Sequence, residues 1–206
     1  MILKILFISE LIGTVAFAMS GALLGIKKGF DSYGITVLAI ITAFGGGMTR
    51  DILVGNTPPT ALIEPFFTVI GIIAAFVTMY LYKTLSNYHN MLQFFDAIGL
   101  AAFAVIGASV ATAHGQTAPF VVISFALLTG TGGGTIRDVL AREVPYVFRK
   151  EIYAVAAIAG GIAYLLSYMF ISEVTAIFAC FTVTLALRLY SMKHNLHLKV
   201  YEEKEE

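Results

Sequence analysis

Long runs of apolar residues, each about the length of a membrane crossing, dominate this chain. An α-helix needs about 20 mostly apolar residues to cross the hydrocarbon core of a bilayer. Short breaks rich in glycine, proline or polar residues separate the runs, as expected for turns at a membrane surface. The pattern predicts an all-α integral membrane protein with seven transmembrane helices, at about residues 5–26, 34–55, 62–82, 92–112, 118–140, 152–171 and 174–190.

Composition supports the membrane assignment and excludes several other classes of protein. Hydrophobic residues make up 58% of the chain and charged residues 13%, whereas soluble domains are about 45–50% apolar and about 25% charged. The net charge of zero gives no electrostatic support for a nucleic-acid partner. The single cysteine, Cys180, excludes an internal disulfide and a cysteine-based metal cluster. Because no hydrolase or P-loop signature is present, we expect no catalytic residues, metal or cofactor, and no enzyme.

A nine-residue motif occurs twice in the chain. Gly45–Leu53 reads GGGMTRDIL, and 87 positions later Gly132–Leu140 reads GGGTIRDVL, with six of the nine positions identical. Upstream positions match at an offset of 86, and at an offset of 87 Pro58 matches Pro145. The first three predicted helices therefore repeat as helices four to six, and the first segment is interpreted as a membrane helix and not as a signal peptide.

The repeats predict how the chain is organised. Because each repeat has three helices, an odd number, the second repeat enters the membrane from the opposite face, and this predicts an inverted-topology repeat. We expect a single transmembrane domain over 1–192, with repeats at about 5–83 and 92–171 and a seventh helix at about 174–190 outside the symmetry. Residues 193–206 are expected to form a charged cytoplasmic tail.

The lysines and arginines other than Arg50 and Arg137 predict the orientation of the protein. The side that holds the N-terminus carries only Lys4, and the other side carries ten of these residues. Positive residues accumulate on the cytoplasmic side. The N-terminus is therefore expected outside and the C-terminus in the cytoplasm. The ten residues are Lys27, Lys28, Lys83, Arg142, Arg149, Lys150, Arg188, Lys193, Lys199 and Lys204.

Each motif places a glycine triplet and two charges inside an apolar run. Glycine in a helix interior costs about 1 kcal/mol relative to alanine, so we expect each helix to kink or open at its triplet, where nearby threonine hydroxyls can supply hydrogen bonds. Charge within a membrane is expensive and usually functional. The glycines are Gly45, Gly46, Gly47, Gly132, Gly133 and Gly134; the threonines are Thr42, Thr49, Thr129, Thr131 and Thr135.

The charges of the motifs are Arg50 and Asp51 in the first copy, and Arg137 and Asp138 in the second. Adjacent side chains on a helix point about 100° apart. We therefore expect each arginine to pair with a carboxylate of another helix and not with its own neighbour.

Glu10 and Asp96 are candidates for that pairing, since they are related by the offset of 86. Both are expected in the first turns of their helices, so a favourable interaction with the helix N-terminus is the alternative. Glu64 and Glu151 are expected to begin helices three and six, where the same interaction is favoured.

Three interpretations of the motifs remain open. In the first, the glycines only allow close helix packing and the arginines extend to the membrane interface. In the second, the two glycine-containing helices line a polar path for cations, with Asp51 and Asp138 presenting negative charge. In the third, Arg50 or Arg137 binds a substrate carboxylate or a lipid phosphate beside exposed backbone amides.

Two copies of a three-helix unit that carries GGGxxRD, followed by a seventh helix, resemble the prokaryotic trimeric intracellular cation (TRIC) channels. Their three-helix unit is also called a glycine-transporter domain. The resemblance covers essentially 1–192. It implies a homotrimer among the lipids of a prokaryotic inner membrane, with a potassium-permeable pore in each protomer. It also implies that the second and fifth helices bound the pore, kink at the glycine triplets and place the arginine–aspartate pairs beside it.

We therefore expect a monovalent cation channel, and the alternative is a secondary transporter of glycine or another small amino acid. A channel predicts a water-filled path lined by threonine and aspartate. A transporter predicts an occluded cavity near the middle of the membrane, with an arginine facing the substrate carboxylate. Inverted repeats occur in both classes, so the fold alone does not decide between them.

Overall fold

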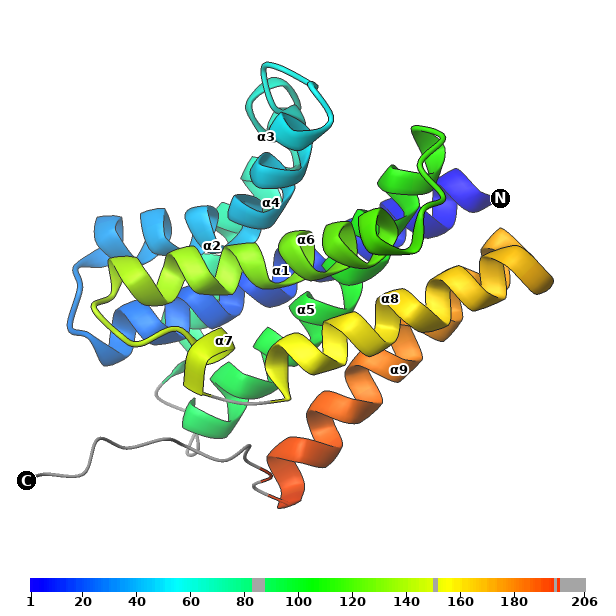
Figure 1. The fold of residues 1–206 in the computed structure, drawn as a ribbon. Coiled ribbons are helices and arrows are strands. Elements are labelled where there is room, and N and C mark those ends of the chain that lie inside the picture. Colours follow the sequence, from blue (N-terminus) through cyan, green and yellow to red (C-terminus); the bar gives the residue numbers. More distant parts are fainter. Residues whose placement is uncertain (83–87, 150–151, 195, 197–206) are drawn as a thin grey trace, which may run out of the picture.

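The structure is a computed structural model that describes residues 1–82, 88–149, 152–194 and 196, and all its regular secondary structure is helical (Figure 1). The helices follow in the order α1 (Ile2–Lys27), α2 (Ser32–Leu53), α3 (Thr60–Ile63), α4 (Pro65–Leu81), α5 (Tyr88–Ala113), α6 (Pro119–Leu140), α7 (Tyr146–Arg149), α8 (Tyr153–Phe170) and α9 (Glu173–His194).

Six of these helices are long and apolar enough to cross a membrane: α1, α2, α5, α6, α8 and α9. They confirm the prediction of an all-α membrane protein. The third predicted span corresponds to α4, an apolar helix of 17 residues that is shorter than these six. The count of seven therefore stays a prediction. Of the predicted tail, α9 includes Lys193 and His194, and the tail otherwise lies outside the described residues except for Leu196.

The helix α5 is the most enclosed of the six: 78% of the residues in its apolar 18-residue stretch are buried, compared with 33–39% in the other five helices. It crosses α1, where the rings of Phe17 and Phe103 stack with centroids 5.3 Å apart. The contacts at this crossing are reciprocal. A Cβ on Gly99 would lie 2.2 Å from the Phe17 ring, and a Cβ on Gly13 would lie 2.9 Å from the Phe103 ring. Gly13 of α1 thus makes room for Phe103 of α5, and Gly99 of α5 makes room for Phe17 of α1.

The helices α2 and α6 run side by side and antiparallel (Figure 1), and the two glycine triplets meet where they cross. A Cβ on Gly46 would lie 2.0 Å from the carbonyl oxygen of Thr129, and a Cβ on Gly133 would lie 2.1 Å from that of Thr42. Only glycine, which has no Cβ, permits the backbones to approach this closely. This supports the packing interpretation of the triplets.

The α-helix continues through both triplets, so the prediction that they open the helix is wrong for this structure. The glycines lower helix propensity, but the backbone of the partner helix packs directly against them and excludes the solvent or side chains that could replace the helical hydrogen bonds. Whether each triplet produces a kink stays a prediction.

The matching of Pro58 with Pro145 is also corrected. The carbonyl of Pro59 accepts a hydrogen bond from Leu62 N, and the carbonyl of Pro145 accepts one from Phe148 N, both at 2.9 Å. Pro59 and Pro145 therefore precede the equivalent short helices α3 and α7. The loop after α2 is one residue longer than the loop after α6. The offset between equivalent residues therefore changes from 87 in the motifs to 86 in the short helices.

Glu64 is the N-cap residue of α4, as expected, although its side chain caps no backbone amide. Its predicted counterpart Glu151 lies outside the described residues.

The crossing of α2 and α6 predicts opposite effects for two adjacent substitutions. Gly46→Ala should lower stability by about 1–3 kcal/mol, because the new methyl group overlaps the Thr129 carbonyl. Gly47→Ala is the matched control, because the nearest atom to its Cβ is Arg50 Nη2 at 3.8 Å. The control should be neutral or stabilising, by up to about 1 kcal/mol, since alanine favours helix. Thermal unfolding in detergent measures both, and equal melting temperatures would contradict this account of the crossing.

Candidate functional site

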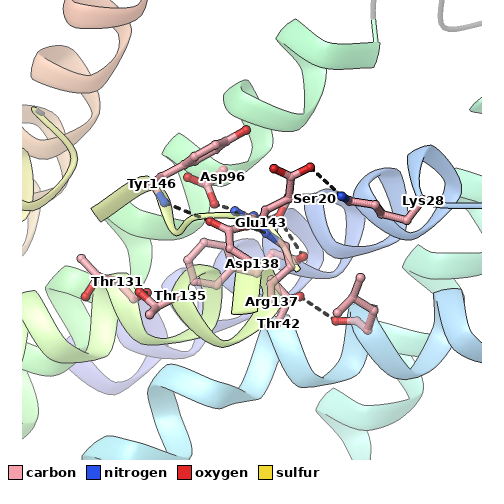
Figure 2. Close-up of polar contacts among 12 residues, drawn as sticks. Ser20, Lys28, Thr42, Asp96, Thr131, Thr135, Arg137, Asp138, Glu143 and Tyr146 are labelled. Carbon is pink, nitrogen blue, oxygen red and sulfur yellow. Dashed lines mark hydrogen bonds and ion pairs between the residues drawn. The ribbon is translucent and has the colours of Figure 1, made fainter. Parts of the chain in front are cut away.

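The guanidinium group of Arg137 is the centre of a buried polar cluster (Figure 2). The side chain is fully buried, yet three helices bring partners to it. Its Nη1 donates to Asp96 Oδ1 of α5 at 2.6 Å and to Ser20 Oγ of α1 at 2.9 Å. Its Nε and Nη2 both lie 2.8 Å from Oδ1 of Asp138, its neighbour on α6. A buried charge requires such pairing.

Asp138 also joins α6 to the short helix that follows. Its Oδ2 accepts a hydrogen bond of 3.0 Å from the backbone N–H of Tyr146, the first residue of α7. The Tyr146 ring lies beneath the guanidinium of Arg137, 5.4 Å from Cζ to the ring centroid, a cation–π distance. Burial raises the pKa of Tyr146 to about 12, so its hydroxyl stays protonated at neutral pH.

The first motif repeats this arrangement. Arg50 donates to Asp51 Oδ1 from Nε at 2.9 Å and from Nη2 at 2.7 Å. Asp51 Oδ2 accepts a 2.8 Å hydrogen bond from the backbone N–H of Thr60, the first residue of α3. In both motifs one carboxylate oxygen therefore holds the preceding arginine, and the other holds the N-terminus of the next short helix.

The expectation that an arginine cannot pair with its own neighbour is thus wrong at both sites. The angle of 100° separates the directions of the Cβ atoms. The arginine side chain is long enough to fold back across that angle, and the aspartate is held in place by the amide of the next helix.

Among the described residues, the arginine of the second motif pairs with a carboxylate of another helix, and the arginine of the first motif does not. For Asp96 the structure shows the first of the two alternatives, pairing with Arg137, whereas Glu10 forms no hydrogen bond or ion pair within the described part of the chain. The expectation that both carboxylates lie in first turns is wrong, because α1 begins at Ile2 and α5 at Tyr88. Glu10 and Asp96 lie more than one turn further along, where the effect of the helix dipole has decayed.

The space around Arg50 differs from the space around Arg137. A small cavity of about 20 Å³ adjoins Arg50 and Asp51 and extends to Glu10 on α1. Its walls come from α1, α2, α3, α4 and α5. The remaining lining residues are Thr14, Ala43, Phe44, Gly47, Thr60, Ala61, Phe67 and Phe103.

Most threonines near the triplets bond to their own helices. Thr42, Thr49, Thr131 and Thr135 each donate from Oγ1 to the carbonyl four residues earlier, at 2.6–2.8 Å. Buried Thr129 Oγ1 has no hydrogen-bond partner among the described residues. The threonine hydroxyls thus supplement helices that remain intact.

Arg188 is a further buried charge, which the sequence interpretation counted among the residues of the cytoplasmic side. It lies inside α9, is 2% exposed, and stacks over the ring of Tyr153 with its Cζ 4.9 Å from the ring centroid. Tyr153 is buried on α8. Its hydroxyl, Asp96 Oδ1 and Arg137 Nη2 all lie beside Gly134 of α6. An arginine within an apolar helix is itself a signal of function, and this signal could have identified Arg188.

Comparison with known proteins defines first the class and then the family. Bacterial membrane proteins align with nearly the whole chain: the inner membrane protein YadS of Escherichia coli is 37% identical over 195 residues, covering 93% of this chain and 94% of YadS. The membrane protein YvgT of Bacillus subtilis is 38% identical over 191 residues, covering 92% and 93%. The chain is thus a multi-pass bacterial membrane protein.

Solved structures agree over the same length. A crystal structure of a prokaryotic TRIC channel in 0.5 M KCl superposes with a TM-score of 0.89 at 38% identity, covering 95% of this chain and 99% of that one. The TRIC orthologue from Rhodobacter sphaeroides gives 0.89 at 30% identity, covering 94% and 100%. The family model described as "Glycine transporter" matches residues 7–83 and 93–169. The chain belongs to this family, the family of the TRIC channels.

The cluster around Arg137 predicts a large loss of stability when its partner is removed. Asp96→Asn leaves a buried guanidinium with less neutralising charge, so stability should fall by about 3 kcal/mol or more. Lys28→Gln is the control, because the Lys28–Glu143 pair, at 2.7 Å, is partly exposed and such pairs contribute about 0–1 kcal/mol. Thermal unfolding in detergent compares the two, and a small loss in Asp96→Asn would mean that Arg137 does not depend on Asp96.

Proposed function

We propose that this protein is a potassium-permeable cation channel with one conduction path in each protomer, bounded by α2 and α6. The observation that carries the proposal is the near-complete structural similarity to TRIC cation channels, with a TM-score of 0.87 at 37% identity over 97% of this chain in one further case. The site residues for this function are the two glycine triplets, Arg50 with Asp51, and Arg137 with Asp138.

The proposed channel is a homotrimer of seven-span protomers, with α4 as the third span and α9 as the seventh. The three helices α1, α2 and α4 form one repeat, and α5, α6 and α8 form a second repeat of inverted topology. Reciprocal contacts support this symmetry: Gly46 meets Thr129 as Gly133 meets Thr42. Pairs of this kind are expected wherever two equivalent helices cross at a twofold axis.

The proposed orientation has the N-terminus outside and the C-terminus in the cytoplasm. Because Arg188 is buried within α9, it is removed from the count of loop charges, which leaves nine residues on the cytoplasmic side against Lys4 on the other. The positive-inside rule therefore still favours the same orientation.

A transporter of small amino acids is the less favoured alternative. In that mechanism an arginine would bind the carboxylate of the substrate. Arg50 is already held by Asp51 through two N–H groups of the guanidinium. Arg137 is held by Asp138 through a hydrogen bond from Nε and an ion pair with Nη2. A substrate carboxylate would have to displace a buried internal one, so the pairing supports cation passage over amino-acid binding.

Flux through liposomes that contain the purified protein tests the proposal. A potassium gradient should produce a membrane potential, measured with a potential-sensitive dye, that does not depend on added glycine. Uptake of labelled glycine on the same preparation should stay at the level of empty liposomes. Saturable glycine uptake without independent potassium conductance would overturn the channel and make Arg50 and Arg137 the candidate substrate-binding residues.

Replacing either motif aspartate should lower potassium flux by about tenfold or more. Asp51→Asn removes the carboxylate that pairs with Arg50, and Asp138→Asn leaves Asp96 as the remaining carboxylate partner of Arg137. Either substitution adds net positive charge beside the path, and a unit charge about 4 Å away acts with about 4 kcal/mol at an effective dielectric constant near 20. Asp31→Asn is the control, because Asp31 caps α2 at an exposed position and asparagine caps equally well. Unchanged flux in Asp51→Asn, Asp138→Asn and the double variant would remove these residues from the path.

A further inference from the structure

The two arginine sites differ in net charge, although their motifs are equivalent. Near Arg137 two arginines, Arg137 and Arg188, are buried with two carboxylates, Asp96 and Asp138, so the cluster is neutral. The lining of the cavity beside Arg50 contains one arginine and two carboxylates, Asp51 and Glu10. Asp51 neutralises Arg50 through two hydrogen bonds. The Glu10 carboxylate forms no ion pair within the described residues, so the lining carries one carboxylate in excess of its arginine.

The two sites also differ in the side chains that fill them. At equivalent positions of the repeats, Thr14 is matched by Leu100 at an offset of 86. Leu100 is fully buried in an apolar cluster with Tyr153. Thr60 is matched by Tyr146, whose ring covers Arg137. Small polar side chains thus leave a cavity beside Arg50, where large ones close the space beside Arg137.

Thr14 provides a second and independent indication of a ligand. It is 1% exposed, lines the cavity, and forms no hydrogen bond within the described residues. Other buried threonines of these helices, such as Thr42 and Thr78, donate to the carbonyl four residues earlier. A buried hydroxyl normally finds a partner, so Thr14 Oγ1 is available to a group inside the cavity.

We propose that the cavity lined by Glu10, Thr14 and Asp51 is a binding site for a monovalent alkali cation. The proposed ligands are the Glu10 carboxylate and the Thr14 hydroxyl, and Thr60 and Asp51 belong to the same lining. Carboxylate and hydroxyl oxygens are the ligands that hard cations prefer. One unneutralised carboxylate matches one positive charge. An anion is disfavoured, because Arg50 is already paired.

The site lies at the first motif only, so the proposal goes beyond the general assignment of a conduction path. Its test measures binding and does not require conduction. Potassium binding without potassium flux would support the site and contradict the proposed function. Potassium flux without binding in the cavity would support the proposed function and contradict the site.

Thermal stability of the purified protein in detergent measures the binding. Exchanging 300 mM N-methyl-D-glucamine chloride for 300 mM KCl, at constant pH, should raise Tm by about 2–5 °C. In Glu10→Gln the increase should vanish. Glu173→Gln is the control, because Glu173 is a carboxylate of α9 outside the cavity lining, and it should keep the full increase.

Thr14→Val covers the case in which Glu10→Gln does not fold. The substitution keeps the shape and charge of the site and removes a hydroxyl that makes no hydrogen bond within the described residues, so the protein should fold. The potassium concentration for half of the Tm increase should rise several-fold. An equal increase in wild type, Thr14→Val and Glu10→Gln would overturn the proposal. So would a wild-type Tm that responds to pH and not to potassium, because Glu10 would then be protonated.

Discussion

A buried guanidinium group must be neutralised inside the protein, because neither lipid nor packed side chains can solvate its charge. In both motifs the following aspartate meets this requirement with one oxygen and uses the other to hold the first amide of α3 or α7. The charge of the arginine is therefore coupled to the position of the connection that leads into α4 or α8. In each motif a single aspartate thus neutralises the arginine and also holds the start of the short helix that follows.

Close approach of the backbones makes this arrangement possible. The triplets allow α2 and α6 to cross without side chains between them. Where α1 crosses α5, a phenylalanine of each helix packs against a glycine of the other. Ser20 of α1 and Asp96 of α5 then both reach Arg137 of α6. Packing and polar chemistry are not alternatives in this protein, since the glycines bring together the helices whose side chains neutralise the charge.

Equivalent motifs acquire different properties because their neighbours differ. In the second repeat, Leu100, Tyr146 and Arg188 close the site and balance its charge, and Arg188 comes from α9, which lies outside the repeated helices. In the first repeat, Thr14 and Thr60 leave a cavity beside an unneutralised carboxylate. The two equivalent sites therefore differ in character: the second is compact and neutral, and the first is polar and adjoins a cavity.

The sequence alone determined the helical membrane architecture, because apolar runs of membrane-spanning length leave few other structures. Its doubled GGGxxRD motif pointed to the family, and the offset between the repeats made Asp96 a candidate partner of Arg137. Local periodicity could not reveal which oxygen Arg50 or Arg137 binds, because a long side chain reaches partners beyond those its Cβ direction suggests. It also could not show that the helices stay intact at their glycines, or that Arg188 joins the buried cluster. Those outcomes depend on which backbones and side chains of other helices lie opposite, and only the tertiary structure decides that.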